Sequence, residues 1–75
     1  MARNLRLTVL IEREDDGFVS KCPEIGVVSQ GDSIEEARAN LQEALELFFE
    51  TAPEEEIQRR LSEGPYVTTV EVAVA

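Results

Sequence analysis

One apolar stripe between residues 34 and 52 constrains the fold of this chain more than any other feature. Apolar side chains recur there at steps of three and four residues, the spacing of one face of an α-helix. The stripe consists of Ile34, Ala37, Leu41, Ala44, Leu45, Phe48 and Ala52. Pro53 ends or bends this helix after its last apolar residue. A long helix with one apolar face needs a second apolar surface to cover it, which the rest of the chain must supply.

The residues in front of this helix indicate a cap rather than a phosphate-binding turn. Gly31 and Asp32 precede Ser33, and Glu36 follows it three residues later. In a capping box the hydroxyl of Ser33 accepts from the N–H of Glu36, and the glutamate reaches back to the N–H of Ser33. Asp32, Glu35 and Glu36 also bring negative charge to the positive end of the helix dipole, where a phosphate would have to bind. We therefore expect Gly31, Ser33 and Glu36 to be structural.

The N-terminal part of the chain predicts a three-stranded antiparallel meander. Residues 5–13 alternate between apolar and polar side chains, as in a half-buried strand. Asp16-Gly17 is a hairpin signal between this run and a second short strand, which Pro23 ends. A short third strand begins at Gly26. We expect Gly17, Pro23 and Gly26 to serve these turns.

The C-terminal part predicts a short helix and a last strand. Residues 53–64 begin with Pro53 and three acids, carry two arginines near their end and stop at a glycine. Residues 66–75 alternate again and predict a strand, which a helical crossover would place parallel to a neighbouring strand. The expected fold is one α+β domain over residues 1–75, in two layers and in the order β-β-β-α-(short α)-β. The long helix packs on one face of its sheet.

The charge balance restricts the class of partner. The chain has sixteen acidic and seven basic residues and no histidine, so its net charge is −9. Such a field repels nucleic acid and anionic membranes and favours basic partners. Cys22 is the only cysteine, so neither an internal disulfide nor a zinc site is expected. No run has the length of a signal peptide or a membrane span, so we expect a cytoplasmic protein.

The residue types present argue against an enzyme. With no histidine and little chain to build a cleft, we predict no catalytic, cofactor-binding or metal-ligating residue. The acids around the first hairpin could form a divalent-metal site or a solvated face, and their spacing matches no EF-hand loop. Seventy-five residues give a marginal core, so a homo-oligomer, a dimer or a tetramer, is expected.

Six residues are predicted to contact a partner or a second subunit, four by their charge and two by their apolar side chains. The two apolar residues lie beside the stripe of the long helix. Either the second helix or the last strand covers them, or they contact another protein. The six are Glu12, Asp15, Asp16, Glu24, Leu47 and Phe49.

Residues 5–50 carry an ordered set of short motifs. They are a strand with a glutamate near its end, an acidic hairpin with a glycine, a loop of the form v-x-x-P-x-l/i-x-G and a helix start of the form G-D-T/S-x-E-E-A. The positions are Glu12, Gly17, Phe18, Pro23, Gly26, Gly31, Asp32, Ser33, Glu35, Glu36, Ala37, Ala44 and Leu45. This set resembles the HicB-type antitoxin domain.

The resemblance implies a partial ribonuclease-H-like fold of three strands, a helix and a strand. It implies a protein that neutralises a small HicA-type mRNA-cleaving toxin by binding it and masking its RNA-binding surface and active site. Such proteins often form dimers or higher oligomers. A toxin that binds RNA must be basic, which suits the acidity of this chain. Members of the family commonly add a C-terminal DNA-binding module, and because this sequence shows none, operator binding is not expected of this chain alone.

Two alternatives to toxin binding stay open from the residues. The first is an orphan structural domain that assembles only with itself, which the marginal core favours. The second is a degenerate ribonuclease-H-like domain that binds a metal ion without activity, for which the hairpin acids would be the ligands.

Overall fold

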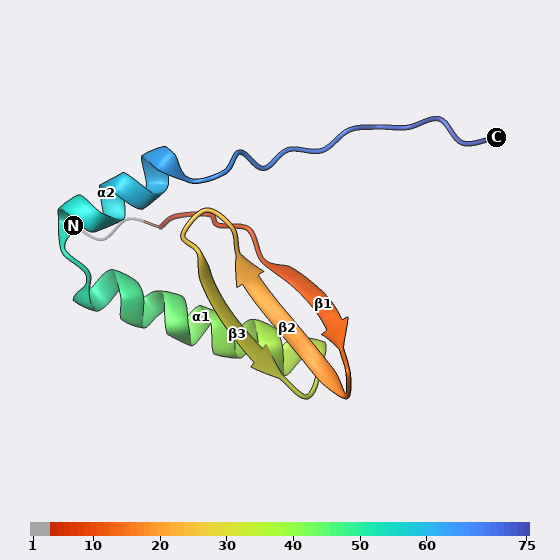
Figure 1. Ribbon diagram of the computed structural model, residues 1–75, viewed down its shortest axis with the longest axis horizontal. Coiled ribbons are helices and arrows are strands. Elements are labelled where there is room, and N and C mark those ends of the chain that lie inside the picture. The colour runs from red at the N-terminus through yellow and green to blue at the C-terminus, as the bar shows by residue number, and fades with distance from the viewer. Residues whose placement is uncertain (1–3) are drawn as a thin grey trace.

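The computed structural model describes residues 4–75 as a three-stranded sheet packed on a long helix, followed by a short helix (Figure 1). The strands are β1 (Leu10–Glu14), β2 (Gly17–Cys22) and β3 (Val27–Gly31), in the spatial order β1-β2-β3 and antiparallel throughout. The helices are α1 (Ile34–Thr51) and α2 (Glu54–Glu63). The α+β class and the three-stranded meander are therefore confirmed.

The fourth strand is not confirmed. Residues 66–75 are extended but pair with no strand in the described part of the chain (Figure 1). Their large apolar side chains face solvent: Tyr66 is 98%, Val70 83% and Val74 89% exposed. The segment leads away from the sheet instead of returning to it, so the parallel pairing expected from the crossover is absent here.

The first strand is shorter than the alternation of residues 5–13 predicts. Leu10 pairs with Lys21, so the ladder would next place residue 9 opposite Cys22 and residue 8 opposite Pro23. Proline has no N–H to donate, and β2 ends at Cys22. Residues 5–9 stay extended beyond the ladder, and a side chain holds them in place, as described below.

The hairpin turn lies one residue earlier than the Asp16-Gly17 signal predicts. Asp15 and Asp16 form the turn, with Asp15 at φ +50°. Gly17 is already the first residue of β2, where it pairs with Glu14 of β1. Gly17 is needed for a different reason: a Cβ there would lie 2.9 Å from the carbonyl oxygen of Gly31. The glycine lets β3 approach closely and does not shape the turn.

The second turn agrees with its predicted residues. Pro23 follows directly after β2, and Gly26 adopts φ +86°, a conformation that favours glycine. The N–H of Gly26 donates to the carbonyl of Cys22 at 2.8 Å, which closes the turn, and β3 begins one residue later.

The core is small and lies between the sheet and α1. Cys22, Ile25, Leu41 and Leu45 form its buried cluster. Ser20 is also fully buried, and its hydroxyl donates to the carbonyl of Ala37 on α1 at 2.7 Å. The predicted stripe is correct except at Ile34, which is 50% exposed because it is the first residue of α1, at the margin of the sheet.

The capping box at the start of α1 is present, with one partner shifted. The hydroxyl of Ser33 accepts from the N–H of Glu36 at 3.0 Å, as predicted. The carboxylate of Glu36 accepts from the N–H of Asp32 at 2.6 Å, and not from the N–H of Ser33. The glutamate therefore reaches one residue further into the loop, which still satisfies two backbone donors.

The second helix is confirmed, and Arg60 fastens it to the body. The guanidinium of Arg60 donates from Nη1 to the carbonyl of Ile25 at 2.7 Å and from Nε to Glu56 at 3.1 Å. Its Cζ also lies 4.8 Å from the centre of the Phe48 ring, and Ile57 is buried beneath the helix. Neither helix among residues 4–75 is long and apolar enough to cross a bilayer.

Candidate functional site

Five carboxylates surround a hollow at one end of the sheet. The hairpin contributes Glu14, Asp15 and Asp16, and the start of α1 contributes Asp32 and Glu36, around a volume of about 670 Å³. We call this the acidic hollow. No lysine or arginine is among its described lining residues. Arg13 stacks on Phe18, one of those residues, with its Cζ 4.9 Å from the ring centre.

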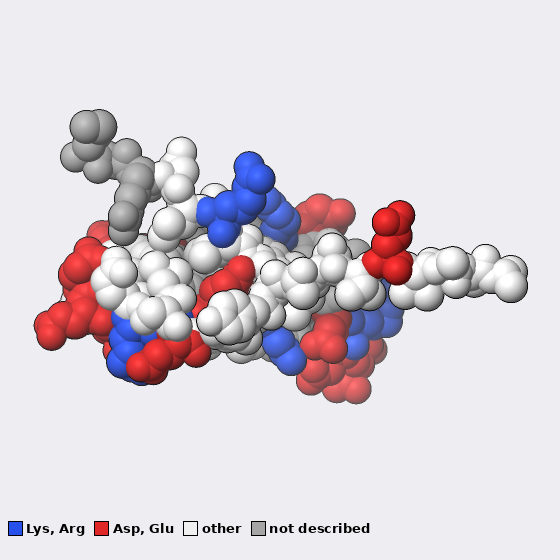
Figure 2. Space-filling model, turned by 90° about the horizontal axis from the view of Figure 1, so that it is seen from above, with Lys and Arg blue, Asp and Glu red and all other residues white. Residues whose placement is uncertain are grey.

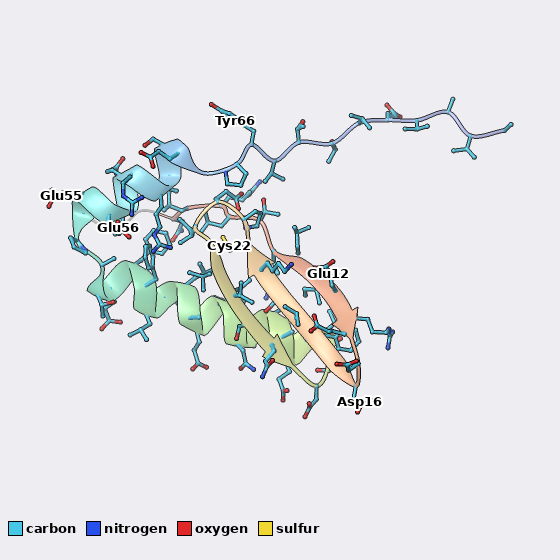
Figure 3. All side chains as sticks on the ribbon, in the orientation of Figure 1. Glu12, Asp16, Cys22, Glu55, Glu56 and Tyr66 are labelled. Atoms are coloured by element: carbon cyan, nitrogen blue, oxygen red, sulfur yellow. The ribbon has the colours of Figure 1, made fainter. Side chains whose placement is uncertain are left out.

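The predicted motif residues build this hollow. Asp15 and Asp16 lie at the hairpin tip, where Figure 3 shows Asp16 pointing away from the sheet. Gly17 and Gly31 bring β2 and β3 together without side chains, and the cap orients Glu36. The hollow thus joins two segments that are about fifteen residues apart along the sequence.

The chemistry available in the acidic hollow is the binding of cations. Carboxylates form strong, often bidentate hydrogen bonds with arginine, and weaker ones with lysine. Within residues 4–75 no group of three or more acidic, histidine or cysteine side chains converges as metal ligands would. The carboxylates of the hollow thus present negative charge without forming a described metal-ligand cluster.

Glu12 does not belong to the acidic hollow. It lies on the outer face of the sheet, away from α1, and pairs with the Nζ of Lys21 at 3.1 Å (Figure 3). Leu10 and Val28 are exposed on the same face, at 51% and 58%. This face is mixed in character, so the structure separates Glu12 from the two aspartates with which the sequence grouped it.

Glu24 is a structural anchor and not a free acidic residue. Its carboxylate accepts from the N–H of Thr8 at 3.1 Å to each oxygen and from the hydroxyl of Thr8 at 2.6 Å. These bonds replace the ladder that Pro23 interrupts and hold residues 5–9 beside the body. Partial burial acts to raise the pKa of Glu24, but the hydrogen bonds from Thr8 outweigh it and hold that pKa below its ordinary value.

We expect Glu24→Gln to destabilise the fold at neutral pH and not in acid. The folded-state pKa lies below the unfolded value of about 4.3, so ionised Glu24 stabilises the protein above that pH. The contribution, about 1.5 kcal/mol at the lower end of the range for hydrogen bonds to a charged group, is lost as the pH falls through the folded-state pKa. Urea unfolding at a series of pH values measures the difference between the two proteins.

Glu43→Gln is the matched control, because Glu43 is exposed and makes no hydrogen bond among the described residues. It should leave the stability almost unchanged at every pH. An equal effect of the two substitutions, or a Glu24→Gln effect that grows in acid, would rule out the anchoring role.

Cys22 is not a nucleophile. It is fully buried, and burial raises the pKa of its thiol above the ordinary value. Its Sγ lies 3.6 Å from a carboxylate oxygen of Glu24, whose negative charge also disfavours the thiolate. A protonated, covered thiol has little reactivity, so Cys22 acts as a small core residue.

A second hollow, mainly apolar, lies on the β1 side of the sheet. It encloses about 730 Å³ between residues 4–9, one side of α1 and the start of α2. Its apolar residues are Leu5, Leu7, Val9, Leu45, Phe49 and Ile57. We call it the β1 groove. The sequence predicted Phe49 as a contact residue, but the groove itself was missed because it needs residues 5–9 to extend past the ladder.

The structure treats Leu47 and Phe49 differently. Phe49 is partly buried, lines the β1 groove and meets Phe48 edge-on with ring centres 5.4 Å apart. Leu47 remains 60% exposed on α1, outside both hollows. Phe49 is thus partly covered, whereas Leu47 is left exposed.

Comparison with known proteins gives the family. A UPF0150 protein of Synechocystis sp. is 44% identical over 66 residues, which cover 85% of this chain and 90% of that protein. The chain belongs to the UPF0150 family. A UPF0150 protein of Helicobacter pylori is 31% identical over 70 residues, 92% of this chain and 97% of that protein. A second Synechocystis UPF0150 protein is 50% identical over 46 residues, 59% of this chain and 58% of that protein.

These relatives extend over nearly the whole chain, and their names state a family without an activity. No family model and no solved structure matches the chain. Any function must therefore be argued from the surfaces described above.

Proposed function

We propose that this UPF0150 protein is a HicB-like protein-binding module of the antitoxin type. Its partner would be a small basic HicA-type toxin that cleaves mRNA, and its role would be to mask the RNA-binding surface and active site of that toxin. The UPF0150 family includes HicB-like antitoxins, which supports the class of function. The proposed place of action is the cytoplasm, where mRNA is found.

The observation that carries the proposal is the acidic hollow. Five carboxylates from two separate segments line it, and no lysine or arginine is among its described lining residues. A surface that has to bind RNA phosphates presents arginine and lysine, and these are the groups that such a hollow attracts. The carboxylates would occupy the same side chains that the toxin needs for RNA.

The charge of the whole chain supports the same partner. A net charge of −9 creates a field that draws a basic protein toward the surface and speeds encounter. On the face shown in Figure 2, acidic side chains cover more of the surface than basic ones, and smaller basic groups lie among them. The same field disfavours direct binding of nucleic acid by this chain.

A pair of matched double variants tests the proposal. Asp15→Asn with Asp16→Asn removes two charges from the hollow, and asparagine tolerates the positive φ of Asp15. Glu43→Gln with Glu55→Gln removes two charges from exposed helix positions that make no hydrogen bond among the described residues. Both proteins have the same net charge, so any difference between them reports on the place of binding.

The probe is any small basic protein that a gene next to this one encodes, produced together with each variant and purified as a complex. We expect the hollow variant to lose about tenfold or more in affinity, and the helix variant to lose about threefold or less through the weaker overall field. Binding titrations at two salt concentrations would measure this. Equal losses in the two variants, or no complex with the original protein, would contradict the proposal.

A further inference from the structure

The C-terminal segment, residues 66–75, has the pattern of a strand without a partner strand. Tyr66, Thr68, Val70, Val72 and Val74 share one face, on which no residue carries a charge. The three valines are 83%, 70% and 89% exposed. Figure 2 shows the segment projecting from the acidic body as a mainly uncharged strip. An exposed strand of this kind is unstable in water unless another sheet edge receives it.

The β1 groove has the complementary features. β1 is an edge strand of the sheet, so one row of its backbone N–H and C=O groups is available for pairing. Beside this edge, Leu5, Leu7 and Val9 from the extended segment face Leu45 and Phe49 of α1. An added strand would bond to the edge and place alternate side chains on these apolar residues.

The opposite edge of the sheet is less open. The chain turns from β3 directly into α1, and Asn40 of that helix donates to the carbonyl of Gln30 in β3 at 2.8 Å. This contact uses an acceptor that a strand added at β3 would need. The free edge with an apolar floor is therefore the β1 side.

The solvent-accessible surface of the chain is larger than that of a compact monomer of the same mass. The chain exposes 6261 Å², whereas a folded monomer of its mass exposes about 4600 Å². Its radius of gyration is 14.4 Å, against about 11 Å for a compact chain of this length. The excess is about 1600 Å² for one chain, about twice the roughly 800 Å² that each partner contributes to a standard protein interface.

We propose that residues 66–75 of one copy form a fourth strand in the β1 groove of a second copy, and that the exchange is reciprocal. The face with Val70, Val72 and Val74 lies on Leu7, Leu45 and Phe49 of the partner subunit, and the face with Thr69 and Glu71 remains in water. Each copy then binds the C-terminal segment of the other in its own groove, which gives a closed dimer with two-fold symmetry. This inference does not depend on the toxin-binding role.

The exit of the segment favours a second copy over the chain's own groove. Gly64 packs closely against the turn after β2, since a Cβ there would lie 2.6 Å from the carbonyl oxygen of Glu24. Pro65 follows and restricts the backbone further. From this point the segment runs away from its own sheet (Figure 1), and the longest dimension of the molecule reaches 47 Å.

Sedimentation equilibrium of the full chain tests the assembly. The original protein should have twice the 8.4 kDa mass of one chain. Val70→Asp with Val72→Asp places charges on the inward face and should return the mass to that of one chain. Thr69→Asp adds a charge on the outward face of the same segment and should leave the dimer intact. A monomeric original protein, or dissociation by Thr69→Asp alone to the same degree, would overturn the proposal.

Nuclear magnetic resonance of a mixed sample tests the place of docking. Isotope-labelled and unlabelled copies are combined, and only contacts between copies are recorded. We expect contacts from the methyl groups of Val70 and Val72 to the Phe49 ring of the other copy. If these contacts are missing from the mixed sample but present in a uniformly labelled sample, the chain fills its own groove. Contacts only between two C-terminal segments would mean pairing of those segments with each other, and either result would refute the exchange.

Discussion

Replacing Gly31 with alanine is expected to remove about 2 to 3 kcal/mol from the folding free energy of this protein. A Cβ at this position would lie 2.5 Å from the backbone nitrogen of Ala37 and 2.8 Å from the carbonyl carbon of Glu36. Both are backbone atoms in the first turn of α1, so no side chain can rotate away. The alanine can fit only if β3 and α1 move apart, which opens the core where they meet.

Urea unfolding followed by circular dichroism measures this loss. Gly26→Ala is the control, because a Cβ there meets only Arg60 Nη1 at 3.8 Å and the cost comes from its positive φ alone, about 1 kcal/mol. Gly31→Ala should therefore cost clearly more than Gly26→Ala. A smaller cost at Gly31 would mean that α1 does not pack against β3 as closely as described.

The sequence predicted the parts of this fold that depend on neighbouring residues. The stripe from Ala37 to Leu45 needs only helical periodicity, and the Ser33–Glu36 cap needs only a spacing of three. The helix break at Pro53 follows from a missing N–H. Each of these signals is satisfied within a few residues, so no knowledge of the tertiary structure was needed.

The predictions were wrong where the role of a residue depends on a contact with a residue distant in the sequence. Gly17 looked like a turn residue, but its lack of a side chain allows the carbonyl oxygen of Gly31, fourteen positions away, to approach closely. Glu24 looked like a surface acid, but β2 ends at Cys22, and beyond the ladder the carboxylate of Glu24 accepts from the N–H and the hydroxyl of Thr8. Ser20 carried no signal at all, since its hydroxyl has a role only once α1 lies above it.

The last predicted strand is a different case, because its pattern is clear but no strand among the described residues pairs with it. Alternation over residues 66–75 predicted a strand in the sheet, and a pattern alone cannot say which sheet edge would receive it. The acidic hollow has the same limitation: Asp15 and Asp16 were predicted as contact residues, whereas Asp32 and Glu36 were understood only as parts of a helix cap. Surfaces that join separate segments require the fold.

The acidic hollow and the β1 groove lie at different ends of the molecule, so each could bind a different partner. Gly31, Asp32 and Glu36 line the acidic hollow at the hairpin end. Leu45 and Phe49 line the β1 groove toward the other end of α1. A reciprocal exchange of C-terminal segments would leave the hairpin ends of both copies open. A dimer of this kind could therefore bind two basic partners, one at each acidic hollow.

Replacing Leu41 with alanine is expected to destabilise the protein by about 3 kcal/mol or more, because the site cannot collapse around the missing side chain. Leu41 is fully buried and is the largest such side chain, in contact with a cluster that includes Cys22 and Leu45. A chain of this length has a total stability of about 4 to 11 kcal/mol, so the variant should be largely unfolded in modest denaturant. Thermal and urea unfolding measure the loss.

Leu47→Ala is the matched control, since it makes the same chemical change on the same helix at a residue that is 60% exposed. Its folding free energy should change by less than about 0.5 kcal/mol. The control also carries information about function, because an exposed leucine that stability does not require is available for contact with another protein. If Leu47→Ala weakens partner binding while the fold is unaffected, Leu47 belongs to an interface. If it destabilises the chain as much as Leu41→Ala does, the arrangement of α1 described here is wrong.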